Sequence, residues 1–266
     1  MSLRKTLFLL LLPLLAGCVG IKAPAEFTYT EIKTDFFTIA SWQKIKNPQK
    51  DSAFQPAAVK IYIEGDGAAF DRFGRPTQNP TPRGHFMRHA AFSDSSDNVV
   101  YLARPCQFVK DTACRQQDWT TGRFSEKILI SMAQAIRQIA QGKEVFLIGY
   151  SGGGFIAAFL AAQPVDSGPF QTRTRLKKLI TIAGNLDHER WTDFHKVLPL
   201  NESLSLHPYQ KQLQTLPQRH FVGGKDVVVP AFLTSDFLGK ENIILFPNAT
   251  HSDGYEDALR QIHLEK

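Results

Sequence analysis

The sequence predicts an α/β fold with a mostly parallel central sheet flanked by helices. Short apolar runs recur along the chain and turn residues follow them, which suits strands buried on both faces of a parallel sheet. Segments with helical periodicity alternate with these runs, as in right-handed βαβ units. The 266 residues are 43% hydrophobic and 21% charged, a composition that excludes a disordered or collagen-like chain.

Six apolar runs are the expected strands of this sheet. In chain order they are Val59–Ile63, Asn98–Ala103, Glu144–Gly149, Lys178–Ala183, Arg219–Val222 and Asn242–Phe246. Residues Phe27–Ile45 precede them and alternate apolar with polar side chains. That alternation predicts one or two additional edge strands.

Four helices are expected between and after the strands. Ser125–Ala140 places its apolar side chains close to a 3.6-residue period, with Ser125 as the N-cap. Gly153–Gln163 is apolar nearly all round and should be buried. Pro230–Leu238 begins with a proline at an early helical position, and the amphipathic segment Asp253–Leu264 closes the chain.

Two connections are too long for a minimal sheet. They are Gly65–Pro82, which is rich in Gly and Pro, and Gly184–Pro217, which has a short helical piece around Glu189–Lys196. Long connections in compact domains are usually functional. We therefore expect them to form a small cap over the carboxyl ends of the strands, where open α/β sheets bind their ligands.

The N-terminus has the features of an export signal. Arg4 and Lys5 form a positive start, Leu7–Leu15 is a nearly continuous apolar run, and small residues follow it. The sequence Leu15-Ala16-Gly17-Cys18 resembles a bacterial lipobox, a signal in which the chain is cut before the Cys and its sulfur receives a diacylglycerol. A plain signal peptide with an incidental cysteine is the alternative.

The lipobox resemblance implies three parts of the chain. Residues 1–17 would be a lipoprotein signal peptide, 18–26 a tether anchored through Cys18, and 27–266 a single α/β domain. Val19 stands where an Asp often retains lipoproteins at the inner membrane. Its presence favours anchoring at the bacterial outer membrane, facing the periplasm.

Two of the three cysteines remain once Cys18 is assigned to lipid. Cys106 and Cys114 delimit a nine-residue segment, and an exported compartment permits a disulfide between them. Such a bridge would contribute about 2–3 kcal/mol by the chain-entropy estimate. Two free thiols are the alternative. No second Cys or His pair lies nearby at zinc-ligand spacing, so no metal site is expected.

The charge pattern limits the classes of partner. The formal net charge of +6 is spread along the chain without a block of like charges. This pattern predicts no nucleic-acid partner and allows a mild attraction to anionic membrane surfaces. The sequence has no stretch of about 20 consecutive apolar residues, so no ordinary membrane-spanning helix is predicted.

The motif with the strongest chemical content is Gly149-Tyr150-Ser151-Gly152-Gly153. A buried strand leads into it and a small, apolar helix leads out of it. That strand–turn–helix context is the one that a G-x-S-x-G nucleophile elbow requires, so Ser151 is the expected nucleophile. A passive glycine-rich turn is the alternative. A phosphate-binding loop would need a Lys-Ser/Thr pair, which is not there.

With this motif the sequence resembles the α/β-hydrolase fold family, over nearly all of the chain from about residue 30 onward. In that family the triad follows the order Ser, acid, His. The acid normally follows the strand two places beyond the nucleophile strand, here Arg219–Val222, and Asp226 lies in the turn after it. Asp226 is therefore the implied acid. Asp187, after the preceding strand, is the alternative, because some family members place the acid there.

The resemblance also implies a base after the last strand. His251 occupies a loop at that strand's end, after both candidate acids. His263 follows later but on a helix face, and His188, next to Asp187, is the alternative base. A carboxylate would fix the imidazole tautomer, and the imidazole would accept the proton of Ser151.

Two backbone N–H groups should face the developing oxyanion. One is that of Gly152, directly after the nucleophile. The other should come from Glu64-Gly65-Asp66-Gly67, where family members often have His-Gly. This departure leaves the second donor open between Asp66 and Gly67. A carboxylate beside an oxyanion is unfavourable unless it points away.

The resemblance implies a lipid-anchored, exported serine hydrolase that acts on an ester-type acyl substrate through an acyl-enzyme. The substrate would be a small or lipid-like molecule, and neither a metal nor an organic cofactor is needed. Arg104–Gln107 and Trp119–Phe124 are similar to motifs of uncharacterised bacterial lipoprotein hydrolases, and Arg104 and Trp119 are candidates for shaping the pocket. The alternatives are a peptidase or acyltransferase on the same triad, and a catalytically silent envelope lipoprotein that binds.

Overall fold

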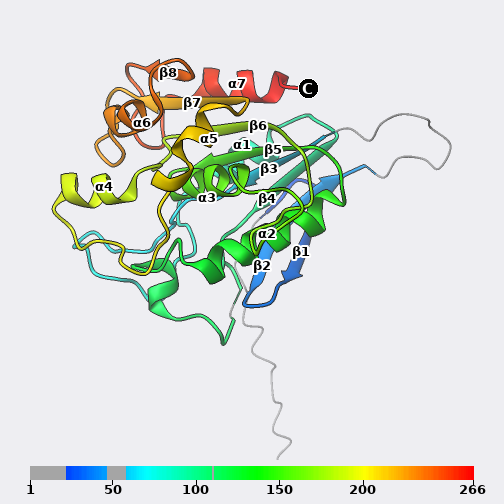
Figure 1. Ribbon diagram of the computed structural model, residues 1–266. Coiled ribbons are helices and arrows are strands. Elements are labelled where there is room, and N and C mark those ends of the chain that lie inside the picture. Colours follow the sequence, from blue (N-terminus) through cyan, green and yellow to red (C-terminus); the bar gives the residue numbers. More distant parts are fainter. Residues whose placement is uncertain (1–21, 47–57, 110) are drawn as a thin grey trace, which may run out of the picture.

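The computed structural model describes residues 22–46, 58–109 and 111–266, and these contain one eight-stranded sheet (Figure 1). The strands are β1 (Thr28–Lys33), β2 (Thr38–Ile45), β3 (Val59–Ile63), β4 (Asn98–Leu102), β5 (Val145–Tyr150), β6 (Leu176–Ile182), β7 (Gln218–Gly223) and β8 (Ile243–Phe246). They lie in the order β1-β2-β4-β3-β5-β6-β7-β8.

The sheet confirms the predicted fold class. Every pairing from β4 through β3, β5, β6 and β7 to β8 is parallel, and β2 is antiparallel to both β1 and β4. The alternating segment Phe27–Ile45 does form two strands, but only β1 lies at an edge. This agrees with the prediction of one or two edge strands, and β2 lies inside the sheet because its other side pairs with β4.

The helices cover both faces of the sheet (Figure 1). They are α1 (Phe86–Phe92), α2 (Glu126–Ala140), α3 (Gly152–Ala161), α4 (His188–His195), α5 (Gln210–Gln214), α6 (Ala231–Leu238) and α7 (Glu256–Leu264). Side chains alternate across the central strands, so Leu147 of β5 enters the core under α2 and α3, while Phe146 and Ile148 enter the core under α1 and α7.

The helices depart from the prediction in details with local causes. Helix α1 is missing from the prediction because it is two turns long and buries only Met87, Ala90 and Ala91. Helix α7 begins at Glu256 instead of Asp253, because Gly254 has a φ of 85° and breaks the helical backbone. Ser125 is the N-cap of α2, yet its hydroxyl makes no capping hydrogen bond. No helix in the described part of the chain is long and apolar enough to cross a membrane.

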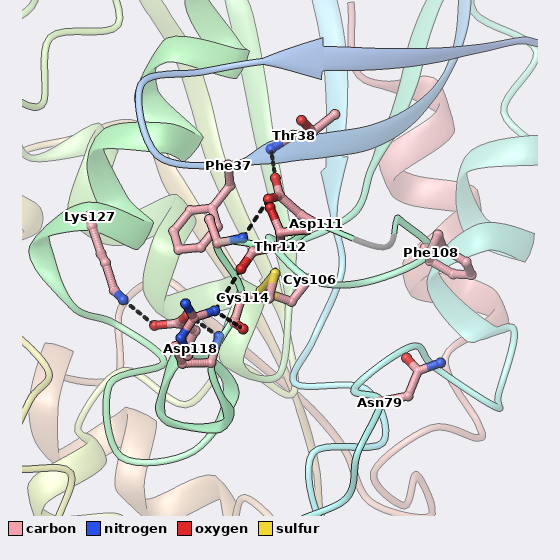
Figure 2. Close-up of a disulfide and its surroundings, with 12 residues drawn as sticks. Phe37, Thr38, Asn79, Cys106, Phe108, Asp111, Thr112, Cys114, Asp118 and Lys127 are labelled. Carbon is pink, nitrogen blue, oxygen red and sulfur yellow. Dashed lines mark hydrogen bonds and ion pairs between the residues drawn. A yellow bond between two sulfur atoms is a disulfide. The ribbon is translucent and has the colours of Figure 1, made fainter.

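A disulfide joins Cys106 to Cys114 in the connection between β4 and α2, as Figure 2 shows. Cys106 is buried in the core, and the loop is also tied down by Asp111, whose carboxylate accepts a hydrogen bond from the Thr38 N–H at 2.7 Å. The disulfide thus closes a loop in the segment after β4, which also carries Arg104 and Gln107, two residues that contact the loop after β3.

We expect this disulfide to contribute measurably to stability. Replacing both cysteines with alanine should lower the free energy of unfolding by about 2–3 kcal/mol, because the unfolded chain regains loop entropy. The melting temperature should fall by about 5 °C or more. Calorimetry of the wild-type protein and the double variant measures the effect, and reductant should shift only the wild type. Two alkylatable thiols in freshly isolated protein would contradict the prediction.

Candidate active site

The turn between β5 and α3 holds Ser151 in a strained conformation. Its φ of 51° and ψ of −122° lie outside the regions that a non-glycine residue normally adopts. The Ser151 N–H donates to the carbonyl of Ile182 at 3.1 Å, and the Ser151 carbonyl accepts from Asn185 N–H at 3.0 Å. The end of β6 therefore holds the serine in this conformation.

Two glycines of the motif are required by close backbone approach. A Cβ atom on Gly149 would collide with the backbone of Gly153, and one on Gly153 would collide with the carbonyls of Ile63 and Glu64. The register of the sheet aligns Ile63 with Gly149, so the loop after β3 packs directly against the serine turn. Small residues are thus needed on both sides of Ser151.

Three predicted residues form one chain of hydrogen bonds. The Ser151 Oγ and His251 Nε2 atoms are 3.0 Å apart, and His251 Nδ1 is 2.8 Å from Asp226 Oδ2. Asp226 lies in the turn after β7 and His251 in the loop after β8. With Nδ1–H donating to the carboxylate, Nε2 of the neutral ring accepts the hydrogen bond of the serine hydroxyl.

Two backbone hydrogen bonds to Oδ1 hold the carboxylate of Asp226 in place. Its side chain is fully buried, and Oδ1 accepts hydrogen bonds from the N–H groups of Val228 and Val229, both at 2.8 Å. Oδ2 is left for His251. The ring of Tyr150 packs against the imidazole with 5.1 Å between centroids. These contacts fix the orientation of the base.

The alternative acid and base have other partners. Asp187 caps α4 by accepting from the Arg190 N–H at 3.0 Å, and no hydrogen bond or ion pair among the described residues joins it to His251. His188 is buried, with Nε2 at 2.8 Å from the carbonyl of Leu204 and its ring packed against Phe155. Neither residue belongs to the hydrogen-bonded chain of Ser151.

Asp187 instead lies in a separate cluster of possible metal ligands. The other two members are Glu189 and His207. One carboxylate oxygen of each acid and one imidazole nitrogen of His207 all lie within 4.8 Å of one another. Glu189 and His207 are exposed and 3.1 Å apart, as an ordinary ion pair would be. Within the described part of the chain, no hydrogen bond or ion pair joins this cluster to the serine turn.

Free backbone donors surround the serine. Within the described residues, no hydrogen bond uses the N–H groups of Gly152, Asp66 or Gly67. The Gly152 N–H is free because it begins α3. Gly65 is clamped, since its carbonyl accepts from Gln107 Nε2 at 3.0 Å. All the predicted oxyanion donors are therefore available, and the choice between Asp66 and Gly67 stays open.

Two arginines neutralise the carboxylate of Asp66. Arg104 pairs with Oδ1, and Arg123 Nη1 is 2.5 Å from Oδ2. Burial alone would raise the pKa of Asp66, but the two guanidinium groups lower it to about 2. A Cβ atom on Gly152 would collide with this carboxylate, so the ion pairs lie directly beside the proposed oxyanion position. The repulsion expected from an unpaired Asp66 is thereby offset.

Arg123 is not among the site residues that the sequence predicts. It lies in the Trp119–Phe124 stretch, and that local motif is the one signal that marks it. Of the two residues proposed to shape the pocket, Arg104 contacts Asp66 directly. Trp119 instead donates its indole N–H to the carbonyl of Thr77 at 3.1 Å and packs against the core.

A cleft of about 750 Å³ opens above the serine. Its lining combines Ser151 and His251 with aromatic, apolar and basic side chains, including Phe70, Phe86, Trp191, Val228, Arg72 and Arg83. The first long connection supplies one wall, and α4 of the second supplies Trp191, whose indole N–H donates to the carbonyl of Val228 at 2.6 Å. Both connections predicted to form a cap thus reach the cleft.

A second hollow of about 430 Å³ lies beside this cleft. It is lined by Lys22, Ala23, Pro24, His85, Arg88, His89 and Phe92. His85 and His89 line the cleft as well, so the two hollows adjoin. The described chain therefore begins next to the rim of the candidate active site.

Comparison with solved structures identifies the fold. A hydrolase of the alpha/beta fold family from Bacillus anthracis is similar to this chain, with a TM-score of 0.55 and 12% sequence identity. The similarity covers 89% of this chain and 97% of that hydrolase. The esterase PF2001 from Pyrococcus furiosus gives 0.56 at 14% identity, over 90% of this chain and 87% of that one. The acylaminoacyl peptidase of Pyrococcus horikoshii gives 0.54 at 14%, with 90% of this chain spanning 39% of the peptidase.

These similarities establish the α/β-hydrolase fold that the motif implied. Identities of 12–14% reach no further than the fold. A scan against models of protein families finds no match to this chain, and a search of curated proteins finds none either.

Proposed function

We propose that this protein is a serine hydrolase that cleaves an ester-type acyl substrate through an acyl-enzyme. The observation that carries the proposal is the hydrogen-bonded chain from Ser151 through His251 to Asp226, beside free backbone N–H groups. Geometry of this kind is what acyl transfer by a serine requires. The hydrolase and the esterase of the same fold support the class of reaction.

The residues divide the reaction into two steps. Ser151 Oγ attacks the carbonyl carbon while His251 Nε2 takes the hydroxyl proton, and the N–H of Gly152 with that of Asp66 or Gly67 binds the oxyanion. The tetrahedral intermediate collapses, His251 gives the proton to the leaving alcohol, and the acyl-enzyme remains. Water then attacks the acyl carbon while His251 Nε2 takes its proton. The bond to Ser151 Oγ breaks, His251 returns the proton to Oγ, and the acid leaves.

Hydrolysis is favoured over acyl transfer by the shape of the site. The cleft opens to solvent, and exposed side chains such as Phe70 stand at its edge. Water therefore reaches the acyl-enzyme. Transfer to another acceptor would instead require a cover that excludes water.

The wild-type protein offers a direct test. A fluorophosphonate should form one covalent adduct, because it needs an activated serine, and a panel of p-nitrophenyl esters of increasing acyl length should then rank the acyl pocket. Absence of both labelling and turnover in folded protein would favour the silent binding lipoprotein. Cleavage of acyl-peptide substrates but not esters would favour the peptidase.

We further propose that the enzyme is anchored in the bacterial envelope, at the outer membrane facing the periplasm. The signal 1–17 and Cys18 lie outside the described residues. In the described part of the predicted tether, Ala23 packs against the core under α1 and α7, and the Phe27 N–H donates to the Pro24 carbonyl at 3.0 Å. The domain therefore takes up the last residues of the tether, from Ala23 on.

Lipidation of Cys18 has a simple readout. Mass spectrometry of protein extracted from membranes should find a mature N-terminus at Cys18 that carries acyl chains, because two or more chains give stable anchoring. Cys18→Ala should release the protein from the membrane fraction or leave its signal uncut. An unmodified mature chain free in the periplasm would contradict the proposed anchor.

A further inference from the structure

Arg123 is a buried cation in the wall of the catalytic cleft. Its side chain is only 5% exposed, and it lines the same cleft as Ser151. The exposed arginines Arg72 and Arg83 line this cleft too. Arg123 differs from them because the protein surrounds it and fixes its position, and that is a costly arrangement for a charge unless the charge has partners.

The structure holds this guanidinium rigidly. Nε donates to the carbonyl of Thr120 at 2.8 Å, and Nη1 donates to Asp66 Oδ2 at 2.5 Å. The Arg123 carbonyl in turn accepts from Arg104 Nη2 at 2.6 Å. Arg104 thus supports the backbone of Arg123 while it shares the same carboxylate. A side chain fixed in this way loses little conformational entropy when it binds a ligand.

Part of the hydrogen-bonding capacity of Arg123 is unused. A guanidinium carries five N–H donors in a planar fork, and no described residue accepts a hydrogen bond from its Nη2. Asp66 supplies one negative charge to two arginines, so this group of three keeps a positive charge. Other carboxylates line the cleft as well. Glu64 accepts hydrogen bonds from Tyr101 at 2.7 Å and from the Gly65 N–H, Asp71 pairs with Arg75, and Asp253 and Glu256 complete the set.

Two aromatic rings pack against the guanidinium of Arg123. The guanidinium carbon of Arg123 is 5.3 Å from the ring centroid of Phe70 and 5.9 Å from that of Trp191. Both rings line the cleft. An anion that binds Nη2 would therefore lie close to two apolar rings, and a less polar surrounding strengthens charge-assisted hydrogen bonds.

We propose that Arg123 binds an anionic group of the substrate, a carboxylate or a phosphate, and so selects acyl substrates that carry a negative charge. The proposal rests on the proposed function, since it assigns a second recognition point to the same cleft. Phe70 and Trp191 would contact the apolar part of the substrate between the scissile carbonyl at Ser151 and the anion at Arg123.

Matched ester pairs test the proposal. The first pair is p-nitrophenyl valerate and mono-p-nitrophenyl glutarate, which differ in a terminal carboxylate. The second pair is a monoacylglycerol and the corresponding lysophosphatidic acid, which differ in a phosphate. We expect the wild-type kcat/KM to favour the charged member of at least one pair by about 10-fold or more, the worth of a charge-assisted hydrogen bond. The responding pair distinguishes carboxylate from phosphate.

Three variants separate recognition from support of the loop. Arg123→Gln should remove the preference by raising KM for the charged ester. Because Asp66 also loses one of its two partners, turnover of both esters can fall, and the ratio of the two kcat/KM values is the readout. Arg123→Lys, which can keep a charge beside Asp66 but lacks the planar fork, should lose most of the preference and keeps the test valid if the glutamine variant misfolds. Arg72→Gln removes an exposed arginine from the same cleft and should leave the ratio unchanged.

Other results would overturn the assignment. Equal losses for both members of a pair would mean that Arg123 acts only through Asp66, and no preference in the wild type would mean that it recognises no anion. If the protein hydrolyses no ester at all, the proposed function fails separately. Calorimetry with monomethyl glutarate and glycerol 3-phosphate then decides the subsite: Ser151→Ala protein should bind one of them, and added Arg123→Gln should abolish that binding.

Discussion

Replacing Ser151 with alanine should abolish fluorophosphonate labelling and lower ester turnover by about 10⁵–10⁶-fold. The substitution removes the only oxygen that contacts His251 Nε2 among the described residues. Ser252 is the matched control, because it is an exposed serine in the lining of the same cleft. Ser252→Ala should keep labelling and most of the turnover.

The measurement should combine intact-protein mass spectrometry of the labelled protein with initial rates on a neutral ester. The stability of the variant against unfolding should be measured in parallel, because alanine at position 151 must adopt the same strained backbone conformation as Ser151. A Ser151→Ala protein that is still labelled would place the nucleophile elsewhere and overturn the proposed mechanism.

Asp226→Asn should lower turnover by about 10⁴-fold while the fold is kept. The contacts of Asp226 give the reason. Oδ1 accepts hydrogen bonds from the N–H groups of Val228 and Val229. The amide oxygen of asparagine would keep these bonds and turn its NH₂ group toward His251 Nδ1. That ring would then carry its proton on Nε2, where it can no longer accept the proton of Ser151.

Asp187→Asn is the matched control for the acid. Asp187 is also buried and also accepts a hydrogen bond from a backbone N–H, that of Arg190, so the two substitutions are chemically alike. Its effect on turnover should be far smaller. His251→Ala should cost nearly as much as Ser151→Ala, because nucleophile and base act as one unit. A severe loss in Asp187→Asn with normal activity in Asp226→Asn would reverse the assignment of the acid.

The fold could be predicted because its signals are local. Buried parallel strands are continuous apolar runs, and β5, Ser151 and α3 follow one another within the single stretch Val145–Ala161. Helix α1 escaped prediction because a helix of seven residues has too few turns to show a period. The interior position of β2 was not predictable, because the strand that pairs with it, β4, lies far away in sequence.

The site shows the same division between local and distant signals. Chain order and turn chemistry locate Ser151, Asp226 and His251, because each lies in the turn or loop that follows a strand. The neutralisation of Asp66 could not be predicted, since Arg104 and Arg123 are 38 and 57 residues away along the chain. Which donor completes the oxyanion site depends on backbone orientation in the loop after β3, which composition does not encode.

The position of Lys22 limits how far the enzyme could travel from a membrane. Four residues lead from Cys18 to Lys22, so the chain between them spans at most about 14 Å. Lys22 shares its hollow with His85 and His89, which also line the catalytic cleft. If Cys18 carries the proposed acyl chains, this rim is held close to the lipid headgroups. Substrates dissolved in the bilayer would then reach Ser151 by a two-dimensional search within the membrane plane, without first crossing the bulk periplasm.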